Sequence, residues 1–467
     1  MFIDQDDTIC AISTPPGIGG IAVARVSGPD AFGIVSRIWR GCDIETAATH
    51  TAHLGEIIDP ADNGSSLDQA LITLFRAPRS FTGENVVEIS VHGSTWIQSE
   101  LLRLLIDAGA RMAQPGEFSR RAFASGKMDL AETEAVADLI ASNSRASHRL
   151  AINQMRGNFS RKLRELRETL LSLCALLELE LDFSEEDVEF ASRHQLLDLA
   201  NDIDSSVSRL VDSFATGSAI KEGIPVAIIG NTNAGKSTLL NLILGDNRAI
   251  VSDIHGTTRD TIEDTVTIKG AVFRIIDTAG LRKTSDPIES LGIDRTLSKA
   301  RSARIIVWVI DPATPADKLA ETAATVTQTA TADGESTPVI AAINKSDLRL
   351  DTTSAETTAK SIGAEICHIS AADGSGLPAL LNLIHDRSGA ARATENEVLV
   401  TNARHYQALV DARQSIRRVI QGLNQSLSGD LIAQDLRETI HHLGTITGSI
   451  TTPEILQTVF TRFCIGK

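Results

Sequence analysis

The sequence predicts a multidomain protein with an α+β N-terminal module and an α/β domain inserted into a helical domain, and three observations predict it. Residues 1–123 mix short strand-like and helix-like patterns, which is typical of an α+β module. Apolar residues recur at helical spacing before residue 217 and again after residue 388. Between these helical segments lie a strand, a glycine-rich loop and a helix, followed by further apolar strands.

The length of 467 residues is too great for one ordinary core and suggests about three domains. The economical arrangement is one helical domain interrupted by the α/β domain, although two separate helical domains would give the same periodicity. The predicted domains are an N-terminal module at 1–123, a helical domain at 124–217 and 388–467, and an inserted domain at 218–387.

The composition limits the possible functions. A net charge of −16 opposes long-range attraction to phosphates, so any contact with RNA must be local. The five cysteines show no metal-binding spacing, which indicates a reducing compartment. No apolar run approaches membrane-spanning length, and the first residues are charged where a signal peptide would be apolar. We therefore expect a soluble, cytoplasmic protein.

In the N-terminal module we expect strands at 8–13, 21–27, 70–75 and 86–91 and helices at 30–39 and 94–108. A glycine-rich segment, Pro15-Pro16-Gly17-Ile18-Gly19-Gly20, lacks the pattern of a dinucleotide-binding loop, and a hairpin is the plainer interpretation. By composition alone, Phe81-Thr82-Gly83-Glu84 and Pro115-Gly116-Glu117-Phe118 are ordinary turns.

In the helical segments, one apolar stripe predicts a long helix that packs against others; its residues are Leu163, Leu166, Leu170, Leu173 and Leu177. Further helices are expected at 402–423, 430–443 and 453–463, the last with Thr452 as N-cap and Pro453 at its first position. A set of arginines allows a basic face for RNA, but a solvated helix face is the plainer interpretation; the set is Arg145, Arg149, Arg156, Arg164 and Arg167.

The most specific motif of the inserted domain is the loop from Gly230 to Ser237, which lies between an apolar strand and a helix. Its glycines allow the backbone N–H groups of the loop to surround a phosphate, with Asn233, Ala234, Gly235 and Thr238 lining it. Lys236 can reach the β- and γ-phosphates, where we assign it a catalytic role, and the Ser237 hydroxyl can bind Mg²⁺.

The remaining parts of a guanine-nucleotide site follow in order. In the polar loop at 256–260, Thr258 can bind Mg²⁺ and sense the γ-phosphate. An apolar strand then ends in Asp277-Thr278-Ala279-Gly280, where Asp277 can hold the Mg²⁺ through water and the Gly280 amide can meet the γ-phosphate. The strand at 305–311 contributes no predicted ligand.

Selectivity for guanine is predicted from Asn344-Lys345-Ser346-Asp347, which follows the strand at 339–343. The Asp347 carboxylate can accept hydrogen bonds from two guanine N–H donors that adenine lacks. Ser370 and Ala371 follow the strand at 366–369 and reach the edge of the base. Because each motif follows a strand, where an open parallel sheet binds ligands, the set predicts a GTPase.

One expected catalytic residue is missing. In Ras, the worked example for this chemistry, a glutamine orients the attacking water, and here that position is Leu281. A leucine side chain cannot hold a water molecule. Hydrolysis must therefore be slow or recruit another group, and such a group is typically worth about 10³ to 10⁵ in rate.

These residues resemble the tRNA-modifying GTPases of the MnmE (TrmE) family, within the TrmE-Era-EngA-like superfamily whose members have a hydrophobic residue at the glutamine position. The resemblance covers essentially the whole chain. The motifs that carry it are Thr14-Pro15-Pro16-Gly17, Phe81-Thr82-Gly83-Glu84, Pro115-Gly116-Glu117-Phe118, Lys127-Met128-Asp129-Leu130, Asn233-Ala234-Gly235-Lys236-Ser237, Gly256-Thr257-Thr258-Arg259-Asp260 and the terminal Phe463-Cys464-Ile465-Gly466-Lys467.

The resemblance implies how the missing glutamine is replaced. Two nucleotide domains would dimerise, and a K⁺ ion beside the phosphates would take the place of an arginine finger. Glu289 matches the glutamate that orients water in the family. The positions that match K⁺ ligands are Asn233, Ser252, Ile254 and Thr257.

The resemblance also implies that the N-terminal module dimerises and binds 5-formyltetrahydrofolate or a related reduced folate. The matching positions are Arg25, Glu84, Lys127 and Lys467. Cys464 lies beside this implied site, and a structural role in the tail is the plainer interpretation than a nucleophile.

The implied reaction adds an aminomethyl or carboxymethylaminomethyl group to C5 of the wobble uridine (position 34) of certain tRNAs. The partner would be the flavin-dependent protein MnmG (GidA), which carries FAD and uses NADH, in a heterotetramer with the homodimer of this chain. The nucleotide domain alone fits a second interpretation equally well, a regulatory or ribosome-assembly GTPase without tRNA chemistry.

Overall fold

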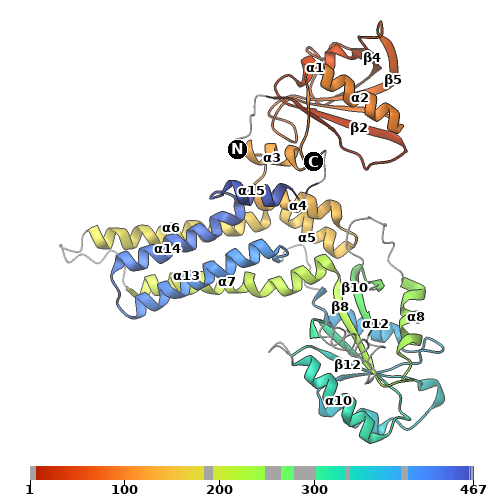
Figure 1. Cartoon of the computed structure of the whole chain (residues 1–467). Coiled ribbons are helices and arrows are strands. Elements are labelled where there is room, and N and C mark those ends of the chain that lie inside the picture. Colours follow the sequence, from red (N-terminus) through yellow and green to blue (C-terminus); the bar gives the residue numbers. More distant parts are fainter. Residues whose placement is uncertain are drawn as a thin grey trace, which may run out of the picture. The chain divides into compact units, whose positions relative to one another are not determined.

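The computed structural model describes residues 7–182, 193–247, 264–277, 301–331, 336–390, 398–461, 463 and 466. The chain divides into two compact units (Figure 1). The first comprises Met1–Ala137, Gln154–Ala191 and Ser426–Lys467, and the second comprises Asp138–Asn153 and Ser192–Gln425. Each unit therefore combines helices from both sides of the inserted domain, and the three predicted domain boundaries remain predictions.

The first unit begins with a seven-stranded sheet in the order β3-β4-β5-β6-β2-β1-β7. Its strands are β1 (Ile9–Ile12), β2 (Gly19–Ser27), β3 (Trp39–Arg40), β4 (Thr51–Asp59), β5 (Ser65–Phe75), β6 (Val86–Gly93) and β7 (Arg111–Met112). Helices α1 (Ala31–Arg37) and α2 (Thr95–Asp107) pack against it. In β5, Ala70, Ile72 and Leu74 are buried while Leu71 is exposed, so one face of the sheet forms the core.

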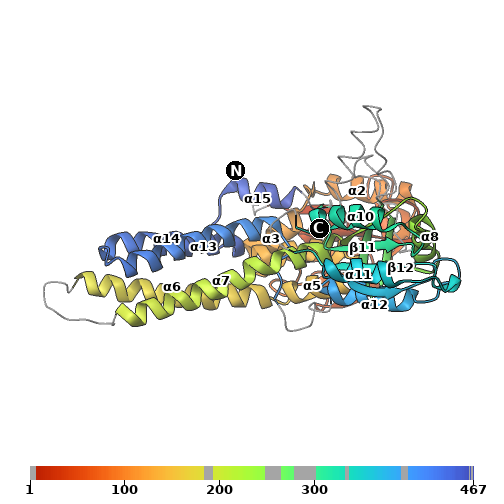
Figure 2. The same cartoon turned by 90° about the horizontal axis from the view of Figure 1, so that it is seen from below.

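The helices of the first unit pack as the leucine stripe predicts. They are α3 (Glu117–Ala124), α4 (Leu130–Ala141), α6 (Asn158–Asp182), α14 (Gly429–Thr447) and α15 (Pro453–Phe460). All five leucines of the stripe are buried on α6, which lies along α14 (Figure 2). The predicted N-cap of the last helix is confirmed, because the Thr452 hydroxyl accepts a hydrogen bond from the Ile455 N–H.

The second unit contains a six-stranded sheet in the order β13-β12-β11-β8-β10-β9. Its strands are β8 (Ile224–Gly230), β9 (Asp264–Ile268), β10 (Ala271–Asp277), β11 (Ile305–Ile310), β12 (Val339–Ile343) and β13 (Glu365–His368). All neighbours pair in parallel except β9, which is antiparallel to β10. All residues of β11 are buried, on both faces of the sheet, and the strand is therefore apolar throughout.

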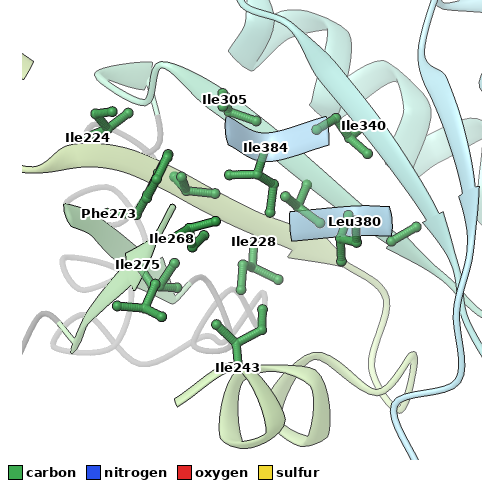
Figure 3. Packing of buried hydrophobic residues seen from close by; sticks show 14 of the residues in the cluster. Ile224, Ile228, Ile243, Ile268, Phe273, Ile275, Ile305, Ile340, Leu380 and Ile384 are labelled. Atoms are coloured by element: carbon green, nitrogen blue, oxygen red, sulfur yellow. The ribbon is translucent and has the colours of Figure 1, made fainter. Parts of the chain in front are cut away.

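Helices cover this sheet and connect it to the rest of the unit. They are α5 (Arg145–Met155), α7 (Arg193–Glu222), α8 (Lys236–Asn247), α10 (Ala316–Ala330), α11 (Thr353–Ser361), α12 (Leu377–Arg387) and α13 (Ala403–Asn424). The main core is aliphatic, with one phenylalanine (Figure 3). Helices α7 and α13, which precede and follow the inserted domain, pack against each other. The predicted fold class is thus confirmed.

The inserted domain also contacts the helix α5. Leu150 is buried within the core of the sheet, and the Ala146 N–H donates to the Gly270 carbonyl at 3.0 Å in the turn between β9 and β10. Lys221 at the end of α7 pairs with Asp138 at 2.7 Å. Among the described residues, no helix is both long enough and apolar enough to cross a membrane.

Candidate functional site

The glycine-rich loop connects β8 to α8, at the carboxyl edge of the parallel strands. Its backbone adopts positive φ at Asn233 (64°) and Gly235 (97°), conformations that asparagine and glycine tolerate best. The Lys236 ammonium donates to the carbonyls of Gly230 and Asn231 at 2.8 and 2.9 Å. Ser237 and Thr238 are exposed at the start of α8, where the N–H groups of the helix favour an anion.

Asn344 connects this loop to the predicted base-binding segments. Its side chain is buried and donates from Nδ2 to the Ala234 carbonyl at 2.8 Å. Its Oδ1 accepts from the Ala371 N–H, also at 2.8 Å. The buried Ser370 and Ala371 are thereby brought beside the phosphate loop. One amide side chain thus holds together the ends of β8, β12 and β13.

Sequence reasoning missed a residue of this site. Asp311, directly after β11, accepts a hydrogen bond from Lys345 Nζ at 2.6 Å and so fixes the lysine beside the exposed Asp347. A carboxylate at the end of a buried strand is the signal that could have identified it.

Several predicted nucleotide-site residues lie outside the described residues. They are Ser252, Ile254, Thr257, Thr258, Thr278, Ala279, Gly280 and Glu289. Asp277 is the last residue of β10, so its backbone is placed at the same sheet edge. Among the residues that the structure describes, no three His, Cys, Asp or Glu side chains gather as a metal site.

The predicted folate residues of the N-terminal module converge on the loop 76–85. The Arg25 guanidinium lies 5.2 Å from the ring centroid of Phe81 and pairs with Glu88 at 2.8 Å. Lys127 Nζ donates to the Pro78 carbonyl at 2.8 Å, and Glu84 belongs to the loop itself. The fourth predicted residue, Lys467, lies outside the described residues.

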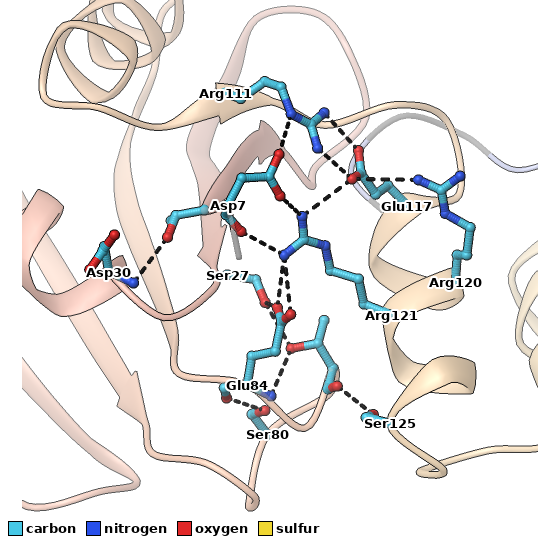
Figure 4. A network of polar contacts seen from close by, with 12 residues as sticks. Asp7, Ser27, Asp30, Ser80, Glu84, Arg111, Glu117, Arg120, Arg121 and Ser125 are labelled. Atoms are coloured by element: carbon cyan, nitrogen blue, oxygen red, sulfur yellow. Dashed lines mark hydrogen bonds and ion pairs between the residues drawn. The ribbon is translucent and has the colours of Figure 1, made fainter. Parts of the chain in front are cut away.

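A buried ion cluster organises this part of the module (Figure 4). Arg121 binds Asp7, Glu84 at 3.1 Å and Glu117 at 3.3 Å, and it is only 1% exposed. Arg111 donates to Glu117 at 2.7 Å from the opposite side. Two motifs that resembled ordinary turns, one around Glu84 and one around Glu117, are therefore joined through one arginine.

Together, the parallel sheet, the phosphate loop at its carboxyl edge and the Asn344 bridge define a nucleotide-binding protein of the phosphate-loop class. Comparisons with known proteins narrow this class. Residues 8–127 match the family described as GTP-binding protein TrmE N-terminus, and residues 130–464 match the MnmE helical domain. The chain belongs to the MnmE family.

Curated relatives align over nearly the whole chain. A protein called tRNA modification GTPase MnmE from Parabacteroides distasonis is 50% identical over 468 residues, covering 98% of this chain and 100% of the relative. Relatives of the same name from Bacteroides fragilis and Cytophaga hutchinsonii are 49% and 46% identical, each over 99% of this chain and over 100% and 98% of their own lengths. Among solved structures, a GTP-binding protein from Sulfolobus solfataricus in complex with GDP aligns with a TM-score of 0.30 and 20% identity, over 49% of this chain and 68% of that one.

Proposed function

We propose that this chain is a cytoplasmic GTPase that acts in tRNA modification. The observation that carries the proposal is the bridge from the phosphate loop through Asn344 to Ala371, within a chain whose relatives named tRNA modification GTPase align over their full length. The Asp347 carboxylate, exposed beside Lys345, selects guanine over adenine.

Mg²⁺ would be held at the phosphate loop. Ser237 is exposed at the amino end of α8, so its hydroxyl can bind a Mg²⁺ ion that also contacts the phosphates. Thr258 would supply a second hydroxyl, and Asp277 would act through water. The bound ion supplies positive charge to the phosphates, while Lys236 holds their position.

K⁺ would supply the transition-state charge that an arginine finger supplies in other GTPases. Asn233 is exposed in the phosphate loop, with a φ of 64°. Ser252, Ile254 and Thr257 would complete the site with oxygen ligands, and Glu289 would orient the attacking water.

We expect GTP turnover at least about tenfold faster in KCl than in NaCl of equal concentration, which corresponds to about 1.4 kcal/mol of barrier. Turnover is measured by phosphate release at constant Mg²⁺. An Asn233→Gly variant keeps a residue that tolerates positive φ and removes the side chain, so it should lose most of the difference. Equal rates of the native chain in both salts would contradict K⁺ activation.

The N-terminal module would bind a reduced folate at the loop 76–85. Arg25 and Lys127 offer cationic groups, and the partly buried Phe81 offers an aromatic ring whose centroid lies 5.2 Å from the Arg25 guanidinium. A folate carries carboxylates and a planar ring, so this combination suits its chemistry. Glu84 and Lys467 would complete the site.

The proposed homodimer would form through the N-terminal module. Leu54 and Leu71 are opposite each other on β4 and β5, on the face of the sheet that does not form the core, and they are 66% and 41% exposed. An exposed apolar sheet face of this kind is typical of an interface. With the flavin-dependent partner MnmG, the dimer would add the aminomethyl or carboxymethylaminomethyl group to C5 of uridine 34.

The test is mass spectrometry of nucleosides from bulk tRNA in cells that lack their own copy of the gene. We expect the native chain to restore C5-modified wobble uridines and Lys236→Ala to abolish them, because the lysine positions the reacting phosphates. Lys360→Ala, which removes an exposed lysine on α11, is the matched control and should restore them fully.

Two outcomes of this experiment would redirect the proposal. If the native chain restores no modified uridine, the result favours a regulatory or ribosome-assembly GTPase. If Lys236→Ala restores them as well as the native chain, GTP turnover is not required for the modification.

A further inference from the structure

The first unit contains a cavity of about 470 Å³ that the proposed GTP and folate sites do not use. Its walls come from the segment before α4, from α6 and from the carboxyl end of α14. Cavities that bind small ligands or single residues of a polymer span roughly 300 to 1,000 Å³, so its size is suitable.

Two arginines that form no ion pair with any described residue line one wall. Arg164 and Arg167 are three residues apart on α6 and therefore share a face of the helix. Within the described part of the chain, neither guanidinium forms an ion pair: Arg164 Nε donates only to the Ser160 carbonyl at 3.4 Å, and Arg167 Nε is buried without a hydrogen-bond partner. A buried N–H group with no acceptor is costly, and an anion in the cavity would satisfy it.

The acidic residues of the cavity are already engaged. The Asp129 N–H donates to Glu132 Oε2 at 2.9 Å, and the Glu132 N–H donates to Asp129 Oδ1 at 2.8 Å, so the two carboxylates cap the start of α4. Burial raises the pKa of Glu132, while the charge of the neighbouring Arg164 acts in the opposite direction without forming an ion pair with it. The arginines are thus the groups left to attract a ligand.

Apolar side chains form the rest of the floor. Leu163 and Leu443 are buried, and Phe123 and Met128 are partly exposed beside them. This combination of an aromatic and aliphatic surface with two unpaired guanidinium groups suits a planar base attached to a phosphate.

We propose that this cavity binds one unstacked nucleotide of a single-stranded or looped RNA segment, with its phosphate on Arg164 and Arg167 and its base against Phe123 and Met128. The inference rests on the proposed function in tRNA modification. A recess, unlike a flat basic surface, accepts a base only when the base has left the helical stack, which favours a loop over a duplex. The net charge of −16 requires such a local contact.

The test measures binding of a labelled tRNA anticodon stem–loop to the full chain by fluorescence anisotropy, across a range of salt concentrations. For Arg164→Gln combined with Arg167→Gln, we expect at least about tenfold weaker binding. The slope of log K against log salt should flatten by about 1.4, because each contact to a single-stranded phosphate contributes about 0.7. GTP turnover without RNA should not change.

The matched control combines Arg161→Gln with Lys162→Gln, which removes the same charge from the same helix. Arg161 bonds Asn158 and Lys162 pairs with Glu165, so neither is free to hold a phosphate in the cavity. Equal losses in the two double variants would show diffuse attraction and overturn the inference, and so would unchanged binding in both.

A second measurement on the native chain removes any dependence on folding of the variants. Hydrogen exchange should slow in peptides covering 160–170 and 443–449 when the stem–loop binds, and unchanged exchange there would overturn the inference. If the proposed function itself were wrong, the result would differ from a failure of the cavity inference alone. The native chain would then neither bind tRNA nor restore modified uridines in cells.

Discussion

An Arg121→Met variant is expected to lose about 3 kcal/mol of unfolding free energy in the N-terminal module, the lower end of the 3–5 kcal/mol typical of a broken buried ion pair. The methionine fills similar space but leaves the carboxylates of Asp7, Glu84 and Glu117 without the guanidinium that joins them (Figure 4). The lower end applies because Arg111 still pairs with Asp7 and Glu117.

Denaturant unfolding, followed by circular dichroism, measures this loss. Arg103→Met is the matched control, because Arg103 also contacts three carboxylates, those of Asp59, Glu100 and Asp107, but its side chain is 42% exposed. Solvent screens such surface pairs, so the control should be far less destabilised. Similar losses in the two variants would mean that burial does not set the strength of the Arg121 cluster.

The same cluster makes stability depend on pH. Burial by itself raises the pKa of Glu117, but the hydrogen bonds from Arg111 and the Gln114 N–H outweigh it and hold the pKa below the usual 4.5. Asp7 likewise has a lowered pKa, where the bonds from Arg111 and Arg121 outweigh burial. A lowered folded-state pKa gives stability that is present above the unfolded value and lost as the pH falls. The stability difference between native chain and Arg121→Met should therefore shrink below about pH 4.5.

Local sequence patterns predicted the five parallel strands of the inserted domain, but not the antiparallel β9 or the helices α10, α11 and α12. Buried parallel strands are continuous apolar runs, and β12 occupies the predicted range 339–343. The phosphate loop and the asparagine motif were recognised because each is a short string that follows such a strand. Their positions at one sheet edge follow from parallel topology.

Contacts between distant segments were not predictable. Arg121 and Asp7 are 114 residues apart, and neither hydrophobic periodicity nor turn composition indicates that they pair. The strand β4 was missed because Ile57 is its only fully buried residue, which leaves no clear alternation. The arginines considered as one basic face are divided between the two units, with Arg145 and Arg149 on α5 and the others in the first unit.

The largest effect on nucleotide binding is expected from Gly235→Ala. An added Cβ would lie 2.1 Å from Asn344 Nδ2, and the φ of 97° is unfavourable for any residue with a side chain. Asn344 must then move, which breaks its buried bonds to the Ala234 carbonyl and the Ala371 N–H. Each lost bond costs about 1–3 kcal/mol, so the two together should weaken binding by at least about 2 kcal/mol, or about 30-fold.

Gly245→Ala separates this steric effect from a general effect of adding a methyl group in the same region. Gly245 lies in α8, and its added Cβ would meet no heavy atom within 4 Å. Alanine is favoured over glycine inside a helix by about 1 kcal/mol, so this variant should bind GTP as the native chain does and be no less stable. Titration with a fluorescent GTP analogue compares the three proteins. If Gly235→Ala bound as tightly as Gly245→Ala, Asn344 would not hold the phosphate loop and the base-binding segments in one site, and nucleotide recognition would have to depend on the loop alone.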